Sequence, residues 1–190
     1  MSLRRHLACA LFVPTVALAQ IGASLGVKRA TGTETARANA DRHGVEFRLQ
    51  YDAQLTGPFS WRAELAGVQM QYPRDIPGLD RRQVSENGLE LPLLVTMRPR
   101  AIGTWRFMAL GGVVPSWRLN CGASGGFVAC DATPGARVGA LIGASAQTDV
   151  SDRRELQLDI RHARGVVAGA GASVWTVGLG VRSRVRRPSA

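Results

Sequence analysis

The chain alternates apolar side chains with polar or very small ones, segment after segment, from about residue 20 to residue 184. The stretch 45–55 is the clearest case, because its odd-numbered residues are apolar and its even-numbered residues are polar or charged. A period of two places the two classes on opposite faces of a β-strand. The length of this stretch also suits a tilted strand that crosses a bilayer, which needs roughly 9–11 residues.

The first residues have the features of a secretory signal peptide. Arg4, Arg5 and His6 give a positive start, residues 7–18 form a short apolar run, and Ala17 and Ala19 supply the small residues that a signal peptidase reads. The apolar run is shorter than the roughly 20 residues of a transmembrane helix, which argues against the alternative of an N-terminal anchor. We therefore expect a signal peptide at 1–19, a single domain at 20–185 and a short tail at 186–190.

The composition of the mature chain points away from nucleic acid and toward a barrel. Loss of Arg4 and Arg5 with the signal reduces the formal charge from +10 to +8. Many of the remaining arginines stand singly at alternate strand positions beside Glu and Asp, rather than clustered as in nucleic-acid-binding proteins. No second apolar run approaches the length of a spanning helix, so a mature chain embedded in lipid must form a closed β-barrel.

Eight strands are predicted, at 20–29, 43–55, 59–72, 88–98, 104–119, 136–147, 153–163 and 172–184. The links after the first, third and fifth strands are long (30–42, 73–87 and 120–135), and those after the second, fourth and sixth are short. Outer-membrane barrels have short periplasmic turns and longer extracellular loops. The alternation changes phase near Gly67, which predicts a one-residue bulge. In the fourth strand Pro92 has no backbone N–H to donate to a neighbouring strand.

The polar face decides between a membrane barrel and a soluble one. It mixes Gly, Ser and Ala with charges of both signs, which can pair inside a narrow cylinder, and the aromatic residues fall near strand ends, as in interfacial belts. These features predict an all-β fold, an eight-stranded antiparallel up-and-down transmembrane β-barrel with a polar, side-chain-filled interior. A soluble, lipocalin-like binding barrel would instead place the apolar face inside. The charged residues of the polar face are Glu46, Arg48, Asp52, Arg62, Glu64, Glu90, Arg98, Arg106, Arg137, Glu155, Asp159, Arg161 and Arg182.

Two short segments resemble a known family. The signal and the Gly-rich first strand resemble those of the PorT-like outer-membrane β-barrel domain. So does the run Leu-Glu-Leu-Pro-Leu-Leu at 89–94, which is followed by Phe-Met-Ala-Leu-Gly-Gly at 107–112. The resemblance covers roughly the whole mature chain and implies an eight-stranded outer-membrane barrel. The chain departs from common barrel sequences at its end, where the last strand is followed by 185–190 rather than ending on an aromatic residue.

Few residues suggest a specific site. Cys121 and Cys130 are the cysteines that remain after cleavage, and an even number in an exported protein favours a disulfide. Arg74, Arg81 and Arg82 in the second long loop are candidates for contact with lipopolysaccharide phosphates. No catalytic, cofactor or metal site is predicted: His162 lacks the His-x-Ser spacing of some outer-membrane lipid hydrolases, and His43 beside Asp41 is a weak match to a protease dyad.

The function predicted from the sequence is that of a non-enzymatic outer-membrane barrel with a structural or surface-interaction role through its extracellular loops. Its expected partners are outer-membrane lipid or lipopolysaccharide and the barrel-assembly machinery, and it is expected to be a monomer without a cofactor. The alternatives are a narrow channel or a lipid-modifying enzyme of the outer membrane, and a soluble periplasmic or secreted binding barrel.

Overall fold

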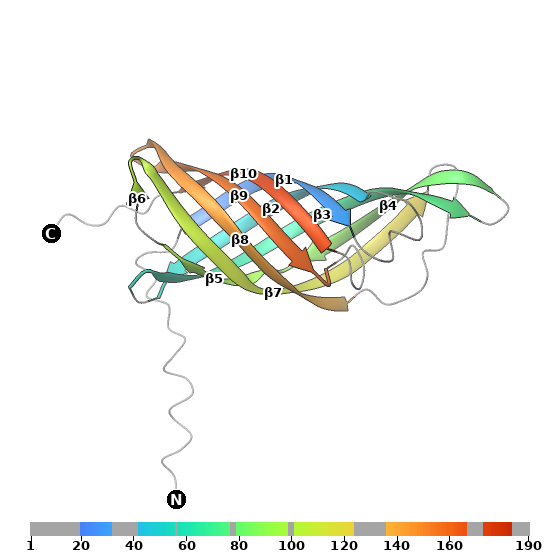
Figure 1. The fold of residues 1–190 in the computed structure, drawn as a ribbon, viewed down its shortest axis with the longest axis horizontal. Coiled ribbons are helices and arrows are strands. Elements are labelled where there is room, and N and C mark those ends of the chain that lie inside the picture. The colour runs from blue at the N-terminus through green and yellow to red at the C-terminus, as the bar shows by residue number, and fades with distance from the viewer. Residues whose placement is uncertain are drawn as a thin grey trace, which may run out of the picture.

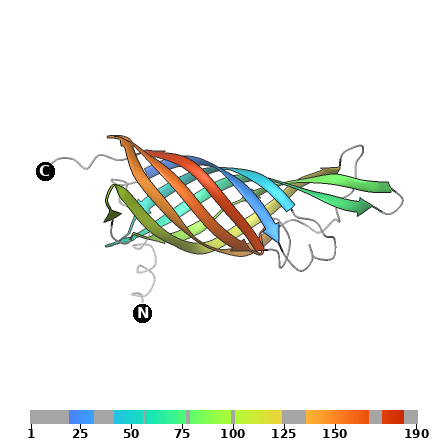
Figure 2. The ribbon, with the colours of Figure 1, turned by 45° about the horizontal axis from the view of Figure 1, so that its top comes forward.

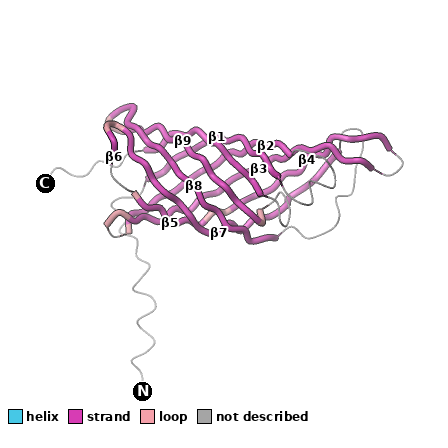
Figure 3. Tube along the Cα trace, viewed as in Figure 1, coloured by secondary structure: helices cyan, strands magenta, loops and turns pink. Residues whose placement is uncertain are grey.

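All of the described strands belong to one antiparallel sheet. The computed structural model describes residues 20–31, 42–55, 57–76, 79–98, 101–123, 136–166 and 173–183. Strands account for nearly all of these residues (Figure 1, Figure 3). They are β1 (Gln20–Thr31), β2 (Arg42–Gln54), β3 (Phe59–Ile76), β4 (Leu79–Glu90), β5 (Leu93–Met97), β6 (Ala101–Ile102), β7 (Trp105–Ala123), β8 (Ala136–Ser151), β9 (Arg154–Arg164) and β10 (Ser173–Ser183).

The sheet closes on itself. The first strand, β1, pairs with both β2 and β10, and the remaining pairings run without a break from β10 through β9, β8 and β7 back to β3 and β2. Both β4 and β5 lie between β3 and β7, so they are two halves of one barrel strand, and β6 is a short addition beside β7. The predicted eight-stranded up-and-down barrel is therefore confirmed, and Figure 2 shows the tilted strands around the cylinder.

The ladder continues around Pro92, where the fourth barrel strand is divided. The backbone N–H of Glu64 in β3 donates to the Pro92 carbonyl at 2.9 Å, and the N–H of Leu91 donates to the Pro115 carbonyl in β7 at 2.8 Å. The proline thus removes one donor but keeps its acceptor, which is why the strand is interrupted without leaving the barrel wall.

The predicted bulge near Gly67 is wrong. The pairing of β2 with β3 runs in one register from His43–Gln71 to Gln54–Ser60, and the alternation of buried and exposed residues passes through Gly67 unchanged. Among the described strands the register shifts at three other places: between Arg74 and Ile76 (β3 with β4), between Asn87 and Gly88 (β4 with β7) and between Asp149 and Ser151 (β8 with β9). The phase change in the sequence has another cause, described below with the interior.

The predicted loop at 73–87 is wrong as well. β3 continues to Ile76 and β4 begins at Leu79, so most of this segment is a β-hairpin that extends the barrel wall (Figure 1). Where its side chains are described, the outward residues Gln83, Ser85 and Asn87 are polar, so alternation with apolar residues does not mark these strands. We call the end of the barrel with this hairpin the hairpin end. The opposite end, with the short links after β2, β5 and β8, is the tight-turn end. The other predicted strand ends differ from the observed ones by at most four residues.

The apolar face of the sheet points outward. Phe47 is 50% exposed, Leu179 is 55% exposed and Val138 is 72% exposed, whereas the charged Arg48 and Asp159 on the other face are each 1% exposed. A soluble protein rarely exposes so large a continuous apolar surface to water. The arrangement is that of a transmembrane barrel, and it contradicts the soluble binding-barrel alternative, which requires the apolar face inside.

Candidate functional site

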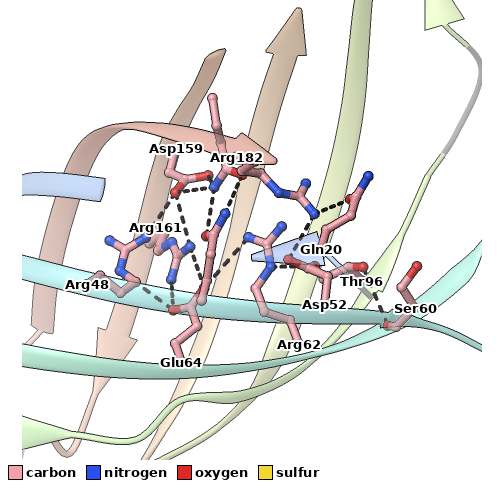
Figure 4. Close-up of polar contacts among 12 residues, drawn as sticks. Gln20, Arg48, Asp52, Ser60, Arg62, Glu64, Thr96, Asp159, Arg161 and Arg182 are labelled. Atoms are coloured by element: carbon pink, nitrogen blue, oxygen red, sulfur yellow. Dashed lines mark hydrogen bonds and ion pairs between the residues drawn. The ribbon is translucent and has the colours of Figure 1, made fainter. Parts of the chain in front are cut away.

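Charged side chains from several strands meet inside the barrel. The period-two pattern sends Arg48 inward from β2, Glu64 from β3 and Asp159 and Arg161 from β9, and Figure 4 shows them converging. All four are almost completely buried. Taking a charge out of water costs several kcal/mol, so these groups are stable inside only if each one meets a counter-charge.

Glu64 is the centre of this network. Arg161 donates to both of its carboxylate oxygens, at 2.5 Å from Nη1 to Oε2 and 2.9 Å from Nη2 to Oε1. Arg48 and Arg62 lie further away, each with a nitrogen 3.6 Å from a Glu64 oxygen. A two-point contact between guanidinium and carboxylate is among the stronger charge-assisted arrangements, so Glu64 ties β2, β3 and β9 together.

Asp159 forms a second centre on the opposite wall. Its Oδ2 accepts from Nη1 of Arg48 at 2.9 Å and from Nη2 of Arg161 at 3.1 Å. The side-chain amide of Gln157 also donates to this carboxylate, at 2.8 Å to Oδ2. Gln157 in turn contacts Gln50 of β2, with 3.0 Å between the Gln50 nitrogen and the Gln157 oxygen. The polar contacts therefore cross the full width of the barrel.

Cations outnumber carboxylates toward the tight-turn end. Asp52 pairs with Nε of Arg62 at 2.8 Å and with Nη2 of Arg182 at 2.9 Å. Gln20 accepts from Arg182 at 2.5 Å and from Arg98, which follows β5, at 3.4 Å. Burial lowers the pKa of the Arg98 guanidinium because desolvation disfavours its charged form, although Asp52 acts in the opposite direction.

Lys28 extends the network from β1 to β4. Its ammonium lies 3.0 Å from a Glu46 oxygen and 2.7 Å from a Glu90 oxygen. Small residues leave room for these long side chains: a Cβ added at Gly26 would lie 3.0 Å from Cγ of Glu46, and one at Gly22 would lie 2.7 Å from Cγ of Arg182. Gly22 and Gly26 are therefore needed on the inward face, because a larger residue would collide with the long side chains opposite them.

An apolar cluster lies beside the charges and was not predicted. On β3 the inward positions change from Arg62 and Glu64 to Val68 and Met70 toward the hairpin end, and on β9 Arg161 is followed inward by Ala163. The phase change near Gly67 in the sequence marks the start of this apolar layer and not a bulge. The buried members of the cluster are Ala30, Ala66, Val68, Met70, Leu94, Leu110, Val114, Leu141, Ala163, Val166 and Val174.

The structure tests the predicted site residues only in part. Cys121 lies in β7 opposite Glu86, but Cys130 is outside the described residues, so the disulfide stays a prediction. The three loop arginines fall on the hairpin of β3 and β4, where Arg74 and Arg82 are register partners and Arg81 is the residue before Arg82. Residues 1–19 and 186–190, predicted as signal peptide and tail, also lie outside the described residues.

A cluster of polar residues on the outer wall was also missed. His162 of β9 and Ser173 of β10 contact each other through Nε2 and Oγ, and the imidazole lies 4.7 Å from the Trp175 ring between centroids. Because His162 is the register partner of Trp175, Ser173 is its diagonal neighbour on the same face. The residue spacing within β9 does not indicate this contact, because Ser173 belongs to the neighbouring strand β10.

Neither a spanning helix nor a metal site is found in the described part of the chain. None of its residues forms a helix long and apolar enough to cross a membrane. In the same residues, no three or more His, Cys, Asp and Glu side chains are grouped so that they could hold a metal ion.

Comparison with known proteins gives similarity of structure but not of sequence. No family model matches the chain, and no curated protein matches its sequence. Membership of the PorT-like family therefore stays a prediction.

Several solved structures share the fold. The outer membrane protein OprG from Pseudomonas aeruginosa superposes with a TM-score of 0.63 at 10% identity, covering 90% of this chain and 97% of that one. Neisserial surface protein A gives a TM-score of 0.57 at 8% identity, covering 87% and 96%. The attachment invasion locus protein Ail of Yersinia pestis gives 0.52 at 12% identity, covering 87% and 97%. The fold of this chain is thus that of small outer-membrane β-barrels.

Proposed function

We propose that this protein is a non-enzymatic, closed β-barrel of the bacterial outer membrane, exported by a cleaved signal peptide, that presents its hairpin end to the outside. The observation that carries this proposal is the opposition of an apolar outer wall to an interior filled with paired charges. An apolar wall matches acyl chains, and the paired charges make the interior stable without a water-filled channel.

The filled interior argues against a pore. Eight strands enclose a space that side chains can just fill. Here Arg48, Arg62, Glu64 and Arg161 occupy the central part of that space, and the apolar cluster adds residues that offer an ion no ligand. We therefore favour a structural and surface-interaction role over transport through the barrel.

The hairpin end is the part best suited to meet partners outside the cell. In barrels of this type the tight turns face the periplasm and the longer connections face outward. The β3–β4 hairpin projects beyond the rest of the barrel wall (Figure 2) and carries Arg74, Arg81 and Arg82 in its sequence. One solved structure of Ail holds the heparin analogue sucrose octasulfate, which shows that a barrel of this fold can bind a polyanion. We propose that the hairpin arginines give this protein a similar affinity for anionic surfaces such as lipopolysaccharide.

A second candidate function follows from the contact between His162 and Ser173. Such a pair could cleave an acyl ester of a membrane lipid: Ser173 Oγ would attack the ester carbonyl while His162 Nε2 takes the hydroxyl proton and passes it to the leaving alkoxide. Water would then hydrolyse the acyl-serine in the same way. In serine hydrolases a carboxylate orients the imidazole, whereas here the ring lies against Trp175, so we place this function second.

Removal of the charge on Glu64 should strongly destabilise the barrel. In Glu64→Gln the guanidinium of Arg161 loses its two-point partner in a fully buried place, which costs on the order of 3–5 kcal/mol of unfolding free energy. Urea unfolding in lipid vesicles, followed by tryptophan fluorescence, measures this loss. Asp152→Asn, in the exposed turn after β8, is the control and should change little.

Because Glu64→Gln can fail to fold, the double variant with Arg161→Met is the second measurement, and it should recover part of the loss. Equal stability of Glu64→Gln and Asp152→Asn would contradict the role given to the network.

Electrical recordings should show no stable pore. The refolded protein in a planar bilayer is expected to give no steady openings on the nanosiemens scale, because the cross-section is filled by buried side chains. A wide porin in the same bilayer confirms that insertion and detection work. Reproducible openings by the refolded protein would favour the narrow-channel alternative.

Loss of the hairpin arginines should weaken attachment to anionic surfaces. We expect the triple variant Arg74→Gln, Arg81→Gln, Arg82→Gln to elute from immobilised heparin at clearly lower salt than the unchanged protein, since fewer cations contact the polyanion. The double variant Arg74→Gln, Arg82→Gln is compared with a control of equal charge that removes Arg153 and Arg154, which lie exposed at the tight-turn end. Unchanged elution of the triple variant, or an equal loss in the control, would show that the hairpin has no special part in binding.

A serine-directed probe separates the two candidate functions. The non-enzymatic proposal predicts that an alkyl fluorophosphonate labels the folded protein in micelles no more than it labels the heat-denatured protein. The second candidate predicts labelling that disappears in Ser173→Ala and in His162→Gln but persists in Ser183→Ala, an exposed serine at the other end of β10. That second pattern would overturn the non-enzymatic assignment.

A further inference from the structure

A groove lies on the outer wall near the tight-turn end, where β2, β1, β10 and β9 run side by side. Its volume is about 450 Å³, within the range of roughly 300–1,000 Å³ that small-molecule sites occupy. We call it the β1 groove, after the strand that forms its floor. The residues that matter for its chemistry are Ile21, Ala23, Leu49, Val181, Arg153 and Arg154.

The floor of the β1 groove is the small side chain of Ala23. Ala23 is the register partner of Leu49 in β2 and of Val181 in β10, and all three are on the outward face. Direct partners on one face of a sheet have their Cβ atoms about 4.5–5.5 Å apart, so a methyl group stands between two branched side chains that extend farther from the sheet. Along β1 the exposed Ile21 and Leu25 flank Ala23. The result is a depression among four aliphatic side chains, which suits an acyl chain.

The end of the groove nearest the tight turns is held in place by Ser183. The backbone N–H of Ile21 donates to Ser183 Oγ at 3.2 Å, and this hydroxyl donates to the Ile21 carbonyl at 3.0 Å. These two contacts continue the attachment of β1 to β10 beyond Gly22 and Arg182, where the backbone pairing ends. The groove is therefore formed before a ligand arrives, which lowers the entropic cost of binding.

The same end of the β1 groove is positively charged. Arg153, in the turn before β9, and Arg154, the first residue of β9, both line the groove and are exposed. None of the described residues that line it is acidic. Of the nearby carboxylates, Asp149 pairs with Arg106, and Asp152 precedes Arg153 in the turn. The groove thus joins an apolar floor to a cationic end.

This cationic end lies where the apolar belt stops. On the outward face of β9, Arg154 is followed by Leu156 and Leu158. On the neighbouring strands β2 and β3, Tyr51 and Trp61 lie at the same end of the barrel, with 5.4 Å between their ring centroids. Aromatic side chains at this level are typical of the membrane interface, and an arginine there extends its guanidinium to the lipid head groups.

We propose that the β1 groove binds an anionic phospholipid of the periplasmic leaflet, with an acyl chain against Ala23 and the phosphate at Arg153 and Arg154. Guanidinium groups match phosphate oxygens in a two-point geometry. A lipid fits better than a soluble anion because the apolar floor adjoins the cations. It also fits better than a second copy of this chain, because a symmetric contact would bring two more arginines to the same place. The inference rests on the proposed function, since the tight-turn end must face the periplasm.

The test measures how tightly the folded protein retains phosphatidylglycerol. The refolded chain in detergent is titrated with phosphatidylglycerol and, separately, with phosphatidylcholine of the same acyl chains, and bound lipid is counted by native mass spectrometry. We expect phosphatidylglycerol to bind more tightly, because the cation of the choline head group opposes the two arginines. The double variant Arg153→Gln, Arg154→Gln should bind phosphatidylglycerol at least roughly tenfold more weakly, because each lost charge-assisted contact is worth about a factor of ten or more.

Two pairs of matched variants separate charge from shape. Arg154→Gln should lose part of the affinity, whereas Arg164→Gln removes the same charge from the outward face at the other end of β9 and should bind normally. Ala23→Leu fills the floor of the groove with every charge in place and should weaken binding severalfold. Ala144→Leu enlarges an exposed outward alanine of β8 and should not change it.

Equal affinity within either pair of variants would overturn the proposal. Equal binding of phosphatidylcholine and phosphatidylglycerol would overturn the assignment to an anionic lipid, and a dimer that excludes lipid would assign the groove to a second copy. Every variant is first checked for heat-modifiable migration on a denaturing gel. If the unchanged protein migrates as a folded barrel but retains no phosphatidylglycerol, only the lipid site fails. If it shows no heat-modifiable migration, the membrane-barrel proposal fails as well.

Discussion

Charge pairing inside a closed cylinder is the condition on which the other features of this structure depend. A strand in lipid can leave neither its backbone groups nor its charged side chains unsatisfied. Closure of the sheet from β1 to β10 satisfies the backbone, and the contacts of Glu64 and Asp159 with three arginines satisfy the charges. Each condition supports the other, because carboxylates and guanidinium groups from different strands meet only when the cylinder is complete.

The same pairing fixes the register of the strands. A slip of one residue would turn an entire strand over, moving its arginines into the acyl chains and its leucines into the interior. Arg48 on β2 and Arg161 on β9 contact common carboxylates from opposite walls, so a slip in either strand removes contacts made by the other. The ionic network thus selects one strand register among possible barrels of similar hydrophobicity. It does so even though a buried ion pair by itself is a weak source of stability.

The sequence predicts those parts of the structure that follow from the alternation of neighbouring residues. The inward position of Arg48 and the outward position of Phe47 follow from the period of two alone. The closure of the eight strands follows from the requirement that no strand edge faces lipid. The predicted bulge near Gly67 and the predicted loop at 73–87 are both wrong for one physical reason. Alternation marks a strand only where its two faces differ in polarity. Above Gly67 on β3 the inward positions become apolar and Gln69 stands outside, so the contrast reverses although the strand continues. The contact of His162 with Ser173 depends on register between strands, which no pattern within one strand contains.

The apolar belt explains where the arginines of the outer face lie on β1, β9 and β10. Strands β1 and β10 carry no carboxylate, and the two of β9, Glu155 and Asp159, face the interior, where Asp159 pairs with Arg48. The apolar belt excludes the arginines of the outer face from its middle. They stand at its two borders, with Arg29 and Arg164 toward the hairpin end and Arg154 toward the tight-turn end. The borders of the belt are the levels of the lipid head groups, so the exclusion of charge from the acyl layer fixes where the outward arginines lie along their strands.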